Sequence, residues 1–322
     1  MTAVAANPER HGRKGALAAV LMLLSLPALL ALTEAVSFYA TNRSNGTIVS
    51  AGIEREYLLY VPRSYDPARP TPLVISLHGG AMWPAAQMEI DRWNRAAEAH
   101  GFLLVYPSGE SGRGPRAWRA GAERGPLRDV AYISELIDTL RVSYNIDSTR
   151  VYANGLSNGG GMAFKLACTL SDRIAAVGMV GTAIFLPWSG CTDQRPVPMI
   201  LFHGTADRAA LYKGGTSWVA QGVFPSIPGW TARYAKRNRC EPAAVERKIA
   251  PDVTRIVYQR CADSASVVLY RIEDGGHTWP GGKPIPEWFV GRTTNSIDAT
   301  AVMWNFFQRH PFGDALTTSR YP

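Results

Sequence analysis

The chain has 322 residues and a formal net charge of +8, with 46% hydrophobic and 19% charged residues. This composition excludes a disordered chain, which would be poor in apolar residues and rich in charge. Only one long apolar run occurs, so a protein with several membrane spans is also excluded. The basic residues are scattered and form no block interleaved with aromatic residues, so we expect no nucleic-acid partner.

The first predicted element is an export segment. Basic residues precede an uncharged, mostly apolar run at 15–32, and small residues follow near Ala35. This order is typical of a secretory signal peptide, although the run is also just long enough to span a membrane. We therefore expect residues 1–35 to be a cleaved signal, which Pro27 favours, or an uncleaved anchor that is the protein's sole membrane contact. Residues 36–322 are then expected outside the cytoplasm as a single catalytic domain.

Strand-like and helix-like segments alternate along this domain. Predicted strands are 54–61, 73–77, 102–106, 150–154, 175–180, 198–202 and 266–272. Predicted helices are 88–100, 130–144, 158–170, 230–238 and 298–307. Gly101 is expected to end the first helix, and Asp129 to cap the second. The alternation predicts an α/β fold, with a mostly parallel sheet covered by helices on both faces.

The four cysteines fit an oxidising compartment. They are Cys168, Cys191, Cys240 and Cys261, and none belongs to a CxxC pair, so we expect neither a zinc site nor a redox motif. Four cysteines allow three disulfide connectivities. We favour pairing between sequence neighbours, in which each bond closes a loop of about twenty residues.

The strongest motif is Gly155-Leu-Ser157-Asn-Gly159, between a predicted strand and a predicted helix. It fits the G-x-S-x-G nucleophile elbow, in which a serine on a sharp turn presents its hydroxyl outward. The flanking glycines leave room for the turn, and the helix N-terminus behind it favours developing negative charge. A glycine-rich turn with an incidental serine is the alternative, but the strand-turn-helix context favours Ser157 as a nucleophile.

A second motif, His78-Gly79-Gly80, directly follows a predicted strand. In an α/β-hydrolase this position supplies one N–H of the oxyanion hole, and the residue after the nucleophile, here Asn158, supplies the other. We assign the first donor to Gly80 or Ala81. His78 itself is expected to be structural, with hydrogen bonds inside its own loop.

The partners of such a serine follow in the order acid, then histidine. Asp207 and His277 each come after a predicted strand, so both belong to the sheet edge that carries Ser157. His277 would take the serine proton, and Asp207 would orient the imidazole. His203 is expected to be a turn residue, and Asp274 is too close in sequence to His277 to be an easy partner.

Three tryptophans lie close in sequence to these candidates. Trp83 follows the oxyanion turn, Trp118 lies in a long Gly- and Arg-rich loop, and Trp279 is two residues past His277. Aromatic faces suit a planar or an aliphatic acyl group, so we predict that these tryptophans bind substrate. Ordinary core packing is the alternative for each of them.

Several segments resemble the secreted polyhydroxybutyrate depolymerase and feruloyl esterase family. The matching segments are 57–62, 77–80, 151–160, 203–207 and Gly275-Gly-His-Thr-Trp-Pro-Gly281, which is the most specific. The resemblance implies the α/β-hydrolase fold and assigns Ser157, Asp207 and His277 to a catalytic triad. The chain departs from the family at Ala81-Met-Trp83, where relatives often carry small residues.

The resemblance also implies a function. We expect a serine esterase that acts on polyhydroxybutyrate-type oligoesters or feruloyl-type esters through an acyl-enzyme, without a metal or an organic cofactor. Two alternatives stay open. One is an acyltransferase with the same triad, and the other is a non-catalytic binding protein of the cell envelope.

Overall fold

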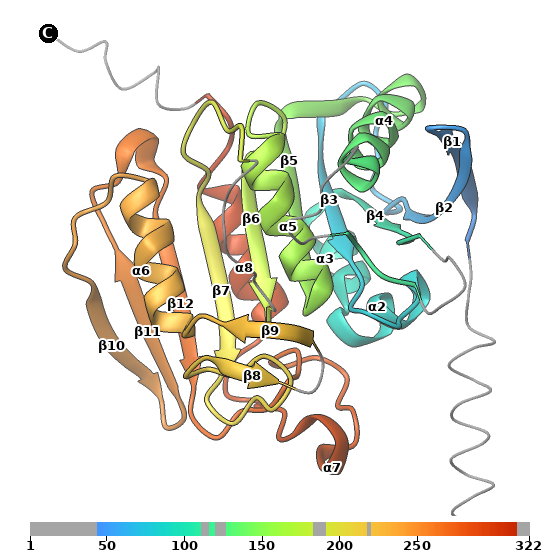
Figure 1. Ribbon diagram of the computed structural model, residues 1–322. Helices are drawn as coiled ribbons and strands as arrows, with labels where there is room; N and C mark the ends of the chain where they lie inside the picture. Colours follow the sequence, from blue (N-terminus) through green and yellow to red (C-terminus); the bar gives the residue numbers. More distant parts are fainter. Residues whose placement is uncertain (1–43, 111–115, 120–126, 183–190, 218–219, 314–322) are drawn as a thin grey trace, which may run out of the picture. The chain divides into compact units, whose positions relative to one another are not determined.

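The computed structural model describes residues 44–110, 116–119, 127–182, 191–217 and 220–313 (Figure 1). The export segment expected at residues 1–35 lies outside these ranges. In the part of the chain that is described, no helix is both long and apolar enough to cross a bilayer.

A ten-stranded sheet forms the centre, in the order β1-β2-β4-β3-β5-β6-β7-β12-β11-β10. Its strands are β1 (Gly46–Ser50), β2 (Ile53–Tyr60), β3 (Thr71–Leu77), β4 (Leu103–Pro107), β5 (Ile146–Leu156), β6 (Ala176–Val180), β7 (Met199–Gly204), β10 (Val245–Ala250), β11 (Val253–Tyr258) and β12 (Val267–Ile272). The six neighbouring strands β4, β3, β5, β6, β7 and β12 are parallel to one another. β2 and β1 extend the sheet at one edge with antiparallel pairing, and β11 and β10 do so at the other. The predicted mostly parallel sheet is confirmed.

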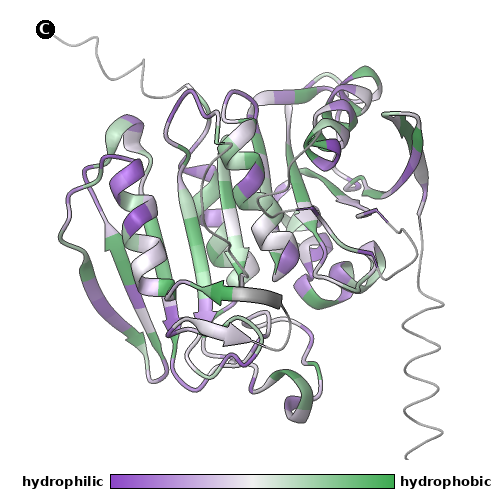
Figure 2. Cartoon of the chain, in the orientation of Figure 1, coloured by the Kyte–Doolittle hydropathy of each residue, from purple (hydrophilic) through white to green (hydrophobic). Residues whose placement is uncertain are grey.

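Helices cover both faces of the sheet. They are α2 (Pro84–Asp91), α3 (Trp93–His100), α4 (Arg128–Ser143), α5 (Asn158–Thr169), α6 (Ile227–Arg237), α7 (Glu287–Val290) and α8 (Ala299–Gln308). Apolar side chains of α4, α5 and α6 join one buried cluster, and those of α2, α3 and α8 join the cluster on the opposite face. The short hairpin of β8 (Gly215–Ser217) and β9 (Ala220–Phe224) lies outside the main sheet. The inner strands are the most hydrophobic, as parallel strands buried on both faces require (Figure 2).

Two predictions about helices are wrong. The segment 88–100 is not one helix, because Arg92 has a left-handed φ of 56° and separates α2 from α3. The Asp91 side chain accepts the N–H of Trp93, the first residue of α3, at 3.1 Å and so satisfies a donor at the start of that helix. Asp129 does not cap α4, since its buried carboxylate accepts hydrogen bonds from Arg55 and from the Arg119 N–H, both at 2.8 Å.

The Arg55–Asp129 pair holds the long loop that begins after β4. Both side chains are buried, and Arg55 also donates to the Ser108 carbonyl at 3.0 Å. Asp129→Ala leaves the guanidinium buried without a counter-ion, and we expect it to lower the free energy of unfolding by about 3 kcal/mol. Urea unfolding measures this loss. As a control, Asp66→Ala breaks an exposed pair with Arg69 and should cost less than about 1 kcal/mol; equal losses would contradict the prediction.

Both disulfides are present, in the favoured pairing of sequence neighbours. Cys168–Cys191 joins the end of α5 to the segment before β7, and Cys240–Cys261 joins the segment after α6 to the one after β11. Each bond therefore attaches a helix that covers the sheet to a neighbouring connection. Among the described cysteines none is free.

Candidate active site

Ser157 lies on a strained turn between β5 and α5. Its φ of 54° and ψ of −117° are unusual for a residue with a side chain. The turn is held because the Ser157 N–H donates to the Val180 carbonyl at 2.8 Å, while the Ser157 carbonyl accepts the Gly161 N–H at 3.0 Å. A Cβ at Gly159 would lie 2.2 Å from the Leu77 carbonyl oxygen, so glycine is needed for α5 to approach the end of β3. The predicted sharp turn is present.

Asp207 and His277 form a direct hydrogen bond. The His277 Nδ1 lies 2.7 Å from the Asp207 Oδ2, and the other carboxylate oxygen accepts the N–H groups of Ala209 and Ala210 at 2.8 Å each. Burial alone would raise the pKa of Asp207, but the charge and hydrogen bond of His277 hold that pKa below its ordinary value. An ionised Asp207 makes Nδ1 the protonated nitrogen and leaves the lone pair of the imidazole on Nε2.

A second histidine, His203, also approaches this carboxylate. Its Nε2 lies 3.5 Å from the Asp207 Oδ2 but only 2.7 Å from the Ala210 carbonyl, which requires a proton on that nitrogen. Burial lowers the pKa of His203, so the ring is neutral. The His203 ring is buried and its hydrogen bond to Ala210 closes the turn 203–210, in agreement with the prediction that His203 is a turn residue.

Hydrogen bonds between strand ends link the candidate residues. Besides the bond from Ser157 to Val180, the Gly181 N–H donates to the Phe202 carbonyl at 3.0 Å and the Thr205 N–H donates to the Ile272 carbonyl at 2.8 Å. A Cβ at Gly181 would lie 3.1 Å from the His277 Nδ1 and 3.4 Å from the Asp207 Oδ2. The link Val180–Gly181 therefore contacts the serine turn on one side and the Asp–His pair on the other.

The loop that carries His277 is fastened to the end of α7 and to the residues that follow it. The His277 N–H donates to the Val290 carbonyl at 2.6 Å, and the Gly276 N–H donates to the Arg292 carbonyl at 2.9 Å. A Cβ at Gly276 would lie 2.2 Å from the Val290 oxygen, so the two segments are in close backbone contact. The sequence analysis missed α7 because it has only four residues.

The assignment of Ala81 to the oxyanion hole is wrong. The Ala81 N–H donates to the Arg116 carbonyl at 2.8 Å and is not available to a substrate. Gly80 fits better, because a Cβ built there would lie 3.7 Å from the Asn158 Cβ, which makes the two residues neighbours. Asn158 is the first residue of α5, and an N–H at that position has no acceptor within its own helix.

His78 stabilises the oxyanion turn through hydrogen bonds of both ring nitrogens. Its Nε2 accepts the Gly109 N–H at 2.9 Å, so Nδ1 carries the proton and donates to the Gly79 carbonyl at 2.7 Å. Complete burial lowers the pKa of His78 to about 4, which keeps the ring neutral. This geometry agrees with the structural role expected for His78.

Two of the three tryptophans do not line a cleft. Trp118 is 3% exposed, and its indole N–H donates to the His78 carbonyl at 2.9 Å. The Asn158 side-chain amide pairs with both backbone groups of Trp118, at 2.6 and 3.0 Å, and so fastens the long loop to the serine turn. Trp279 is 1% exposed and donates to the Thr300 hydroxyl at 2.9 Å. Their predicted contact with substrate is therefore wrong.

Trp83 stays near the surface beside the oxyanion turn. It is half-buried, and the Arg116 guanidinium lies 4.4 Å from the centre of its ring. The cation covers one ring face, which leaves less of the indole for a substrate. The role of Trp83 in substrate binding stays a prediction.

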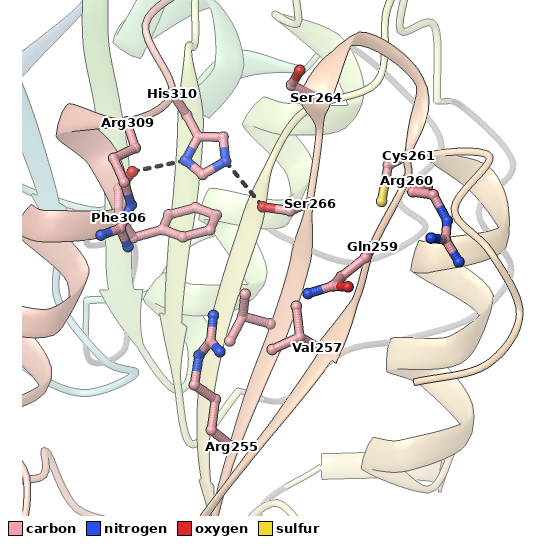
Figure 3. A pocket seen from close by; sticks show the side chains of 11 residues that line it. Arg255, Val257, Gln259, Arg260, Cys261, Ser264, Ser266, Phe306, Arg309 and His310 are labelled. Atoms are coloured by element: carbon pink, nitrogen blue, oxygen red, sulfur yellow. Dashed lines mark hydrogen bonds between the residues drawn. The ribbon is translucent and has the colours of Figure 1, made fainter. Parts of the chain in front are cut away.

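A separate cavity of about 530 Å³ lies at the amino end of β12, beside Ser266 and His310 (Figure 3). Its lining includes Arg255, Val257, Ser266, Phe306 and Arg309, and none of the candidate catalytic residues. This cavity is therefore separate from the candidate active site. Within the described ranges, no group of three His, Cys, Asp or Glu side chains could hold a metal ion.

Known proteins resemble the chain in sequence and fold. The family model described as esterase PHB depolymerase matches residues 55–216, a range that contains Ser157 and Asp207. A bifunctional acetylxylan esterase/xylanase from Neocallimastix patriciarum is 28% identical, over 70% of this chain and 31% of that protein. Feruloyl esterase B from Piromyces equi is 29% identical, over 71% of this chain and 44% of that protein. The chain thus spans less than half the length of either relative.

A solved structure supports the fold. The acetyl xylan esterase from Aspergillus awamori matches with a TM-score of 0.55 and 14% identity, over 81% of this chain and 98% of that one. At this identity the likeness concerns the fold alone, and it confirms the predicted α/β-hydrolase architecture.

Proposed function

The chain belongs to the esterase PHB depolymerase family, and we propose from this membership that it is a serine hydrolase of carboxylic esters. Ser157 is the proposed nucleophile, His277 the general base and Asp207 the acid that orients it. The observation that carries the proposal is the 2.7 Å bond from His277 to Asp207, at the sheet edge where Ser157 occupies its strained turn. A strained residue at a turn is a frequent feature of functional sites.

The proposed reaction proceeds in two halves. The His277 Nε2 takes the Ser157 proton while the serine oxygen attacks the ester carbonyl, and the imidazolium then protonates the departing alcohol. Water, deprotonated by the same nitrogen, attacks the acyl-enzyme, and Ser157 regains its proton as the acid leaves. Asp207 stays ionised and stabilises the imidazolium in both halves.

The oxyanion of each tetrahedral intermediate would bind at the start of α5. The N–H of Asn158 and the N–H of Gly80 are the proposed donors, and each is worth about 3 kcal/mol in the transition state. The aligned peptide dipoles of α5 add favourable potential at the same point. His78 and Trp118 act here only as supports that fix the backbone of the turn.

The proposed substrates are polyhydroxybutyrate-type oligoesters or feruloyl-type esters. The family description supports the first, and the relative named as feruloyl esterase B supports the second. The two disulfides support a location outside the cytoplasm, where such bonds persist.

A serine-directed phosphonate tests the proposal. We expect it to label the wild-type protein at Ser157 and to leave Ser157→Ala unlabelled, and we expect this variant to lose about a million-fold in kcat on p-nitrophenyl butyrate. Ser143→Ala, which changes an exposed serine on α4, is the matched control and should behave as wild type. Absence of both label and turnover in the wild type would instead indicate a non-catalytic binding protein. Product partition with an added alcohol separates hydrolysis from acyl transfer.

A further inference from the structure

Exposed aromatic side chains gather at one place on the described surface. Of the Trp and Phe residues in the described part of the chain, only Trp288 and Phe289 are exposed, by 83% and 56%. They are neighbours on α7, and their ring centres lie 5.8 Å apart at an interplanar angle of 56°. We call this pair the aromatic platform. Because its rings face solvent, it adds little to the core.

The aromatic platform is joined to the candidate active site through backbone contacts. Val290, the last residue of α7, accepts the His277 N–H at 2.6 Å, so Phe289 is one residue away from a direct partner of the proposed base. Gly291 packs against Gly276, where a Cβ would lie 2.5 Å from the Gly291 Cα. α7 lies at the lower end of the sheet in Figure 1, as does the β8–β9 hairpin that follows Asp207. The platform is therefore attached to the loop that carries the proposed base.

The chemistry of the segment 284–289 indicates what it binds. Pro284 and Pro286 have no N–H, and the N–H groups of Phe289 and Val290 both donate to the Pro286 carbonyl. Glu287 is the only charged residue in the segment 284–289. The surface thus offers apolar area but few hydrogen-bond donors. A polysaccharide needs both donors and acceptors along its hydroxyl groups, whereas an aliphatic polyester has only ester acceptors between apolar units.

We propose that the aromatic platform binds an aliphatic polyester chain and holds it while one of its esters enters the site. This inference rests on the proposed function and narrows its substrate class. Two neighbouring aromatic rings that face solvent offer apolar area to a ligand, and exposed apolar patches commonly mark interaction sites. The platform provides binding energy and takes no part in bond breaking.

Adsorption and catalysis test the proposal separately. Adsorption to poly(3-hydroxybutyrate) particles is measured by depletion from solution, with Ser157→Ala as the background so that the polymer is not degraded. Adding Trp288→Ala and Phe289→Ala to this background should weaken the partition constant at least about tenfold. Adding Val142→Ala, an equally exposed apolar residue on α4, should leave it unchanged. In the Ser157 enzyme, the same double change should leave kcat/KM for p-nitrophenyl acetate within about twofold, since such exposed positions seldom affect the fold.

The outcomes distinguish the platform from other roles. Unchanged adsorption in the double variant overturns the proposal, and so does adsorption to insoluble xylan that exceeds adsorption to the polyester. Loss of p-nitrophenyl acetate turnover in a folded double variant also overturns it, because the pair would then act through the position of His277. Failure of the proposed function has a different signature, which is a wild-type protein that turns over no ester while its adsorption can still be measured.

Discussion

His277→Ala is expected to lower kcat on a soluble ester by about a million-fold while the protein stays folded. The His277 imidazole bonds to Asp207 and lies beside Gly181, where a Cβ would be 3.1 Å from its Nδ1. Gly181 follows Val180, whose carbonyl accepts the Ser157 N–H. Without the imidazole, no base takes the serine proton, and only oxyanion stabilisation and substrate binding would contribute to the residual rate. Stopped-flow and steady-state assays measure the loss, and circular dichroism checks the fold.

His203 provides the matched comparison for this prediction. It is the second imidazole near Asp207, but its Nε2 bonds to the Ala210 carbonyl. His203→Gln keeps an N–H donor for that carbonyl, and we expect kcat to fall by less than about tenfold, the scale of a modest shift in the orientation of Asp207. If the two histidine variants lost similar activity, the assignment of His277 as the base would be contradicted.

Gly159→Ala is expected to lower the free energy of unfolding by about 3 kcal/mol and to abolish most activity. The added Cβ would lie 2.2 Å from the Leu77 carbonyl oxygen and 2.5 Å from that of His78. Both are backbone atoms, so the overlap is relieved only by a shift of α5 or of the oxyanion turn. Either shift moves the N–H of Asn158 relative to that of Gly80. Urea unfolding and kcat on p-nitrophenyl butyrate measure the two effects.

Gly80→Ala is the control for the effect on stability. Its Cβ would meet the Asn158 Cβ at 3.7 Å, which is ordinary van der Waals contact. The free energy of unfolding should therefore stay within about 0.5 kcal/mol of the wild-type value. An equal loss of stability in both variants would show that the close approach of α5 to β3 is not the cause.

The central strands were predictable because strands buried on both faces consist mainly of apolar residues. Thr71–Leu77 and Met199–Gly204 are buried along their whole length, and such strands appear in a sequence as short apolar runs. The strand β10 was missed because all but one of its residues are exposed and charged side chains interrupt it. β1 and β11 were missed for a related reason, since polar residues leave only two or three consecutive apolar residues in each.

The errors at the site have a common cause. The sequence places Trp118, Trp279 and Ala81 close to reactive residues, but it does not show which N–H groups already have an acceptor inside the protein. Each of the three donates within the fold, to the His78 carbonyl, the Thr300 hydroxyl and the Arg116 carbonyl respectively. Those acceptors lie far away in the chain, so only the folded structure identifies them. Ser157, Asp207 and His277 could be predicted from strand ends and chain order without knowledge of side-chain contacts, and their joint catalytic role stays a prediction.

The backbone hydrogen bonds of Ser157, Gly181 and Thr205 connect the ends of neighbouring strands. Changes that alter the pairing of these strands therefore differ in consequence from changes in the surface segments. The relative positions of the candidate groups depend on the register of β5, β6, β7 and β12, and a one-residue slip in any of them would exchange its inward and outward side chains. Segments such as 284–289 contribute no strand to this register. Their length and composition could therefore diverge between descendants. New polymers or small esters could then be bound while the relative positions of the proposed catalytic groups stay the same.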